Sequence, residues 1–244
     1  MEVSAYNETF ELPAATADDS RLKALLALFE EMMETAGRHA EILGVGVRDL
    51  HPKGLTWVLA RLHVKVNIIP GGGQPVHIAT WPAGRHRLFA LREFRLSDDS
   101  DNEILRASSA WALMNMETRR PARLDPHLPV FTRHPERMIA DDFPALPPGQ
   151  QAGSQASYRA VAADIDLNDH VNNTVYMAWA LRSIPAKILR PPLTLEAAFL
   201  GEARLGDEIV CRSESAVENG RTIFLQSLQD AVSGRELNRL RWGF

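Results

Sequence analysis

The chain has 244 residues, of which 45% are hydrophobic and 24% are charged, the composition of a globular protein with one large domain or two of ordinary size. Its net charge of −4 argues against nucleic-acid binding, so an acidic partner would have to meet a local basic patch. The single cysteine, Cys211, excludes an internal disulfide and fits a reducing compartment. We see neither a signal peptide nor an apolar run long enough to span a membrane, and therefore expect a cytoplasmic protein.

The first half predicts one strand, one long helix and four further strands. The first strand covers residues 3–12, and apolar residues then recur at helical spacing from Leu22 to Ala36, toward an end marked by Gly44. Turn residues such as Pro82-Ala83-Gly84 follow at short intervals, which favours an antiparallel meander. The four strands are predicted at 56–69, 75–81, 88–96 and 104–116.

Two titratable residues, His39 and Glu41, lie near the end of the predicted helix. Neither has a second clustered partner, and the helix already has a packing role. We therefore expect both to be structural residues.

Seven of the fifteen prolines fall between Arg120 and Gly149, a density that prevents both a helix and a central strand. We interpret this stretch as a long, stiff connection that crosses the surface.

The second half repeats the plan of the first. It predicts a strand at 157–163, a helix at 172–184, and strands at 193–201, 208–217, 222–230 and 236–242. The Asn219-Gly220 pair is a strong hairpin signal. An internal repeat of roughly 100 residues follows. The predicted fold class is α+β, with two helix-plus-antiparallel-sheet units at 1–120 and 151–244 and a Pro-rich linker at 121–150.

Polar side chains gather where the strand of the second half meets its helix. Asp166, Asn168 and His170 occupy every second position, and Asn172 or Asn173 can cap the apolar helix that follows. An acid, an amide and an imidazole beside the partly positive end of a buried helix form a site that can stabilise a developing oxyanion. An Asx-rich helix cap without any catalytic role would produce the same pattern.

The run D-I-D-L-N-D-H-V-N-N-x-x-Y-x-x-W, from Asp164 to Trp179, resembles the signature of acyl-acyl carrier protein (acyl-ACP) thioesterases, which is shared in outline by other hotdog-fold thioesterases. Further stretches that resemble this family are H-A-x-x-L-G-x-G (39–46), G-L-T-W-V-L-x-R (54–61), T-W-P-x-G (80–84) and the run 108–121. The resemblance covers nearly the whole chain and implies a double hotdog, with the acyl pocket in the N-terminal unit and catalysis in the C-terminal unit. Without a plastid-targeting extension, the chain resembles the compact bacterial form.

The resemblance also implies that Glu202, in the stretch 199–203, is a catalytic glutamate. A strand that returns antiparallel to the second helix would bring Glu202 back past the start of that helix, facing Asp166, Asn168 and His170. Our hypothesis is that Glu202 deprotonates water as general base, with a pKa raised by partial burial. Asn168 and His170, with a backbone N–H near Val171 or Asn172, would hold the carbonyl oxygen or the water.

Asp166 would hold His170 in position or share the water, and the sequence leaves open whether Asp166 or Glu202 is the base. A cysteine nucleophile has been considered for the family just after the glutamate, where this chain has Ala203. Cys211 is out of register, so we reject a covalent cysteine mechanism. No metal-ligand spacing and no phosphate-binding glycine loop appear, so we expect neither a metal nor a cofactor.

The resemblance implies an acyl slot around the helix 22–43 and the strands bearing Trp57 and Trp81. The partner would be an acidic acyl carrier protein, and a homodimer is compatible with the sequence. Basic residues that can meet the carrier protein form two clusters, Arg85, Arg87, Arg92 and Arg119, Arg120, Arg123.

Three alternatives remain: an acyl-CoA thioesterase, an acyl hydratase, and a hotdog sensor that binds acyl thioesters without cleaving them. The sensor predicts an attached DNA-binding segment and a broken catalytic set. We see no basic helix-turn-helix region, and all four candidate residues are present.

Overall fold

The computed structural model describes residues 5–14, 20–125, 127–128, 136–148 and 153–244. In these residues, segments of alternating apolar and polar side chains form a single antiparallel sheet. Within those residues the sheet has ten strands, in the order β1-β3-β4-β5-β2-β7-β10-β9-β8-β6. The strands are β1 (Tyr6–Glu11), β2 (Leu55–Val66), β3 (Pro75–His86), β4 (Phe89–Ser97), β5 (Glu103–Asn115), β6 (Ser154–Arg159), β7 (Leu193–Phe199), β8 (Glu208–Glu218), β9 (Arg221–Asp230) and β10 (Glu236–Gly243). The helices are α1 (Ser20–Ile42), α2 (Val47–Leu50) and α3 (Asn173–Arg182), with 3₁₀ turns η2 (His51–Lys53), η3 (Ala162–Asp164) and η4 (Ala186–Ile188).

The two halves of the sheet have the same strand order. Counted from its outer edge, the first half runs β1-β3-β4-β5-β2 and the second runs β6-β8-β9-β10-β7. They join where β2 pairs antiparallel with β7, with Arg61 opposite Ala198 and Val66 opposite Leu193. This repetition confirms the predicted internal repeat and the α+β double hotdog.

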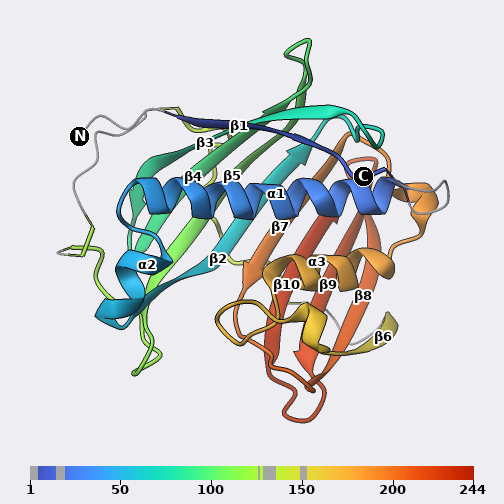
Figure 1. Ribbon diagram of the computed structural model, residues 1–244. Helices are drawn as coiled ribbons and strands as arrows, with labels where there is room; N and C mark the ends of the chain where they lie inside the picture. The colour runs from blue at the N-terminus through green and yellow to red at the C-terminus, as the bar shows by residue number, and fades with distance from the viewer. Residues whose placement is uncertain (1–4, 15–19, 126, 129–135, 149–152) are drawn as a thin grey trace.

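Helices α1 and α3 lie on the same face of the sheet: α3 lies over the second half, and the longer α1 passes beside it and extends across the first half (Figure 1). The predicted stripe of α1 is confirmed, because Leu25, Phe29 and Met32 are fully buried. One apolar core joins the halves: Phe29 of α1 and Trp242 of β10 have ring centroids 6.5 Å apart. Burying a side chain of this size stabilises the fold by roughly 1.5–3 kcal/mol, so each half depends on the other.

Of the predicted linker 121–150, the structure describes residues 121–125, 127–128 and 136–148. The stretch 136–148 contains neither helix nor strand and is held by groups of β4, β2 and β10. Glu93 Oε2 accepts from the Met138 N–H at 2.9 Å, and His63 Nδ1 lies 2.7 Å from Asp141 Oδ2. Arg239 of β10, in the second half, donates to the carbonyl of Leu146. These contacts tie residues 136–148 to strands of both halves.

Several predicted boundaries are wrong. The predicted strand 56–69 ends at Val66, because the N–H groups of Asn67 and Ile68 both donate to Ile104 O. Pro82-Ala83-Gly84 is a β-bulge inside β3 rather than a turn, since a bulge accommodates a proline that has no N–H to donate. The hairpin turn comes later, where Arg87 adopts a φ of +53°.

The predicted strand 157–163 ends at Arg159, because the N–H of Ala160 bonds to Asp207 O and η3 follows. The predicted strand 193–201 ends at Phe199, because Leu200 and Gly201 both donate to Leu237 O. The short helix α2 was not predicted. Among the described residues, no helix is long and apolar enough to cross a membrane.

Candidate active site

The loop between η3 and α3 is organised by the side chain of Asp166. Its Oδ1 accepts from the backbone N–H groups of Asn168 at 2.8 Å and His170 at 3.4 Å. Its own N–H donates to His170 O at 2.8 Å, and Asp169 adopts a φ of +60° at the tip. Asp166 therefore shapes the backbone that carries the amide and the imidazole, as Asx residues do in turns.

Asn172 caps α3, as predicted, by accepting from Thr174 N–H at 3.0 Å. The backbone N–H groups proposed as oxyanion donors are already engaged: Val171 donates to Ala203 O at 2.9 Å, and Asn172 donates to Asp164 O at 2.8 Å. That expectation is wrong, because both donors are used to fold the loop.

Glu202 lies three residues beyond the end of β7, in a segment that is fixed on both sides. Before it, Gly201 N–H donates to Leu237 O at 3.0 Å. After it, Ala203 N–H donates to the hydroxyl of Tyr176, a buried residue of α3. Burial raises the pKa of Tyr176 to about 12, so its hydroxyl stays neutral. Glu202 thus stands on a rigid backbone beside the start of α3.

The structure places Glu202 beside the loop between η3 and α3, where its carboxylate contacts His170. His170 Nε2 lies 3.2 Å from Glu202 Oε2. Burial lowers the pKa of His170, and the cations Arg119 and Arg204 lower it further, against the opposing effect of Asp166 and Asp169. The imidazole is therefore neutral at pH 7, next to a partly exposed carboxylate.

Two side chains from the first half complete this site. The Arg119 guanidinium, from the turn after β5, forms an ion pair with Glu202. Thr56 of β2 donates to Asn168 Oδ1 at 3.4 Å, and His51 Nε2 lies 3.3 Å from the Thr56 hydroxyl. From the sequence we expected Arg119 on a docking surface, and no pattern distinguished Thr56 from its neighbours.

Three other titratable residues, Cys211, His39 and Arg92, are buried inside the protein. Cys211 is buried in β8 with a pKa raised to about 11 by burial, so its thiol is a poor nucleophile. His39 is buried beneath Tyr6, and burial lowers its pKa to about 4. Arg92 is also buried, so it cannot meet a partner at the surface as predicted. No cluster with metal-binding composition occurs in the described parts of the chain.

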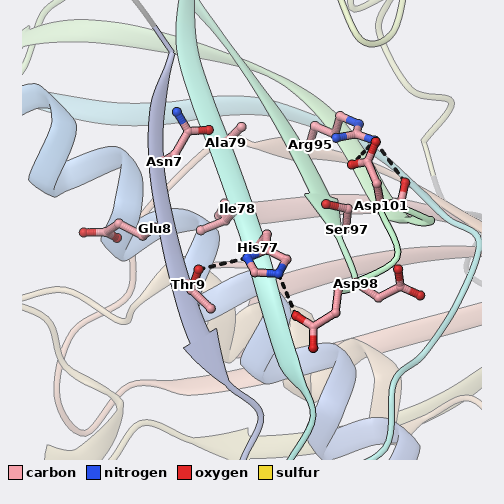
Figure 2. A pocket seen from close by; sticks show the side chains of 11 residues that line it. Asn7, Glu8, Thr9, His77, Ile78, Ala79, Arg95, Ser97, Asp98 and Asp101 are labelled. Carbon is pink, nitrogen blue, oxygen red and sulfur yellow. Dashed lines mark hydrogen bonds and ion pairs between the residues drawn. The ribbon is translucent and has the colours of Figure 1, made fainter.

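A hollow of about 540 Å³ lies elsewhere, against β1, β3, β4 and the turn that follows β4 (Figure 2). In it, Thr9 Oγ1 lies 2.9 Å from His77 Nδ1, and His77 Nε2 lies 2.8 Å from Asp99 Oδ1. This resembles a hydroxyl-imidazole-acid chain, but the Asp99 side chain is 67% exposed, whereas the acid of a catalytic triad is buried. The chain of bonds ties the edge strand to a turn, and none of the four candidate residues lines the hollow.

Comparison with known proteins places this fold in one family. Residues 3–129 match the acyl-ACP thioesterase N-terminal domain, and residues 149–244 match the C-terminal domain. The chain is 28% identical to a chloroplastic palmitoyl-acyl carrier protein thioesterase of Cuphea hookeriana, over 87% of this chain and 55% of that protein. It is 28% identical to the chloroplastic oleoyl-acyl carrier protein thioesterase 1 of Arabidopsis thaliana, over 76% and 56% of the two chains. It thus spans about half the length of these relatives.

Solved structures agree with the fold. A 12:0-ACP thioesterase from Umbellularia californica superposes with a TM-score of 0.81 at 21% identity, covering 98% of this chain and 93% of that one. An acyl-ACP thioesterase from Bacteroides thetaiotaomicron gives 0.76 at 24% identity, covering 98% and 97%. With both family domains matched in order across most of its length, the chain belongs to the acyl-ACP thioesterase family.

Proposed function

We propose that the protein hydrolyses the thioester of fatty acyl-acyl carrier protein, releasing a free fatty acid and holo-acyl carrier protein and so ending fatty acid synthesis. The observation that carries this proposal is the contact between Glu202 and His170, beside the amide of Asn168, in a chain of this family. The named relatives in plants act on palmitoyl- and oleoyl-acyl carrier protein, which supports the substrate class.

Hydrolysis requires three events at the thioester. Water must lose a proton as its oxygen attacks the carbonyl carbon, the carbonyl oxygen must be stabilised as it becomes negative, and the C–S bond must break. The thiolate leaves readily and takes up a proton. Activation of water and stabilisation of the oxyanion are therefore the steps that the protein must assist.

Glu202 is the proposed general base. The Arg119 guanidinium favours its ionised form, which is the form that accepts a proton from water. The neutral His170 holds Glu202 or the water at its Nε2. Asp166 accepts from the loop backbone and so positions Asn168 and His170, whereas Glu202 takes the proton.

Asn168 is the proposed donor to the carbonyl oxygen. Its Oδ1 accepts from Thr56, which fixes the orientation of the amide, and its Nδ2 lies 3.5 Å from Asp166 Oδ2. One N–H of this group thus remains for the substrate. Removing a single preorganised donor of this kind costs on the order of a hundredfold in rate.

The remaining assignments are also proposals. The acyl chain would lie in the N-terminal hotdog, and the acidic carrier protein would meet the exposed residues Arg87, Arg120 and Arg123. The protein would act in the cytoplasm, where its one cysteine stays reduced.

The test is thiol release from a panel of acyl-acyl carrier proteins of increasing chain length, with the matched acyl-CoA esters beside them. We expect rapid release from at least one carrier-protein substrate. Faster release from the CoA esters would make the protein an acyl-CoA thioesterase. Tight binding of acyl thioesters with no thiol released would favour the sensor and contradict the proposal.

A further inference from the structure

Arg119 reaches the active site from the N-terminal half through a turn that is tightly held. The residue has a φ of +56°, a left-handed conformation that is strained for a residue with a side chain. Asn115 fixes this turn, since its Oδ1 accepts from the N–H groups of Glu117 at 3.1 Å and Thr118 at 2.7 Å. The carbonyl of Asn115 also accepts from Arg119 N–H at 2.9 Å. Such strain persists only where neighbouring contacts over-determine the conformation.

The guanidinium lies against both partners of the proposed catalytic pair. Arg119 Nη2 forms an ion pair with Glu202 Oε2 and lies 3.5 Å from His170 Nε2. Arg235, the other cation that contacts Glu202, donates to its carbonyl oxygen at 2.9 Å and not to its carboxylate. Around His170 the charged groups are Arg204, Asp166 and Asp169. In the described chain, Arg119 is therefore the cation on the carboxylate of Glu202.

Stability alone does not account for this arrangement. The Arg119 side chain is 54% exposed, and an ion pair exposed to that extent contributes little to the free energy of folding. A strained turn that presents such a residue would weaken the fold if it had no other role.

We infer that Arg119 is a positioning residue for the proposed general base: it holds the Glu202 carboxylate against His170 and favours its ionised form. The inference rests on the proposed hydrolase function and deepens it. It also means that the N-terminal hotdog takes part in the chemistry in addition to holding the acyl chain.

The test is the pH profile of kcat and kcat/KM for thiol release in the wild type, Arg119→Gln and Arg119→Lys. Arg119→Gln is expected to lower kcat on the order of tenfold, because the carboxylate is no longer held in place. Its acid limb should move to higher pH by about half to one unit, since a carboxylate or imidazole that loses a neighbouring cation binds its proton more readily. Arg119→Lys retains the charge, so it should keep the acid limb and recover part of kcat.

The matched control is Arg95→Gln, which removes an exposed ion pair of 2.9 Å with Asp101, outside the site. It should leave both kcat and the acid limb unchanged. A rise in KM alone in Arg119→Gln would overturn the inference and make Arg119 a carrier-protein contact. An unmoved acid limb, or a loss of kcat that matches a loss of folded protein by circular dichroism, would also overturn it. In each of these cases the active wild type leaves the hydrolase function standing, whereas a wild type that releases no thiol would end both.

Discussion

Replacing Tyr176 by phenylalanine tests whether α3 holds Glu202, the proposed general base, through its backbone. Tyr176 is 1% exposed, and its hydroxyl accepts from Ala203 N–H at 2.8 Å. Phenylalanine fills the same space but leaves that buried N–H without an acceptor, which costs about 1–3 kcal/mol. Ala203 follows Glu202 directly, so the carboxylate should shift. We expect kcat for thiol release to fall on the order of tenfold, because sub-ångström to 1 Å displacements of catalytic groups carry costs of this size.

The assay is urea unfolding together with kcat on an acyl-acyl carrier protein substrate. Tyr158→Phe is the matched control, because it also removes a hydroxyl that bonds to α3, from Tyr158 to Trp179 O at 2.9 Å, but away from Glu202. It should lose about 1 kcal/mol of stability and keep its kcat. Equal kcat values for the two variants, or a Tyr176→Phe protein as stable and active as the wild type, would refute this reasoning.

Three further predictions concern Thr56, His39 and Cys211. Thr56→Val should lower kcat about threefold to tenfold, because it removes the hydroxyl that donates to Asn168 Oδ1 at 3.4 Å and orients the amide. Thr56→Ser keeps the hydroxyl and should restore kcat. Equal kcat in both variants would show that this hydrogen bond does not position Asn168. The native pKa of His39 is about 4, below the unfolded value of 6.5, so the unfolded chain binds the extra proton and stability falls as pH drops through this range. From pH 7 to 5 this loss is about 2 kcal/mol, and it should be absent in His39→Gln, as urea unfolding at both pH values would show. Cys211→Ala should keep its activity within about twofold, and a complete loss in a folded variant would reopen a covalent mechanism.

Local patterns predicted much of the fold because the residues that decide it are close together in the chain. The stripe of α1 and the Asn172 cap each depend on neighbours within a few residues, and both are confirmed. The prediction of a turn at Pro82-Ala83-Gly84 failed for a physical reason. These residue types are common both in turns and in β-bulges, and the pairing of β3 with β4 makes this stretch a bulge. The short α2 was missed, although Glu41 accepts from Arg48 N–H at its start.

For the candidate site, the sequence indicated the residues that come from the C-terminal half but not those that come from the N-terminal half. The family resemblance singled out Glu202, and the rise of a helix and a returning strand showed that it could reach the loop, where it contacts His170. Arg119 and Thr56 could not be assigned in this way, because they lie 83 residues before Glu202 and 112 before Asn168. Their place depends on the pairing of β2 with β7, which brings the two halves together.

The most direct test of the account compares Glu202→Gln with the wild type in thiol release from an acyl-acyl carrier protein. Glutamine keeps the shape of the side chain but cannot accept the proton of water. We predict that Glu202→Gln folds, as judged by circular dichroism, and that its kcat is lower by about a hundredfold or more. A folded Glu202→Gln protein with kcat near that of the wild type would show that Glu202 is not the base and would contradict the account.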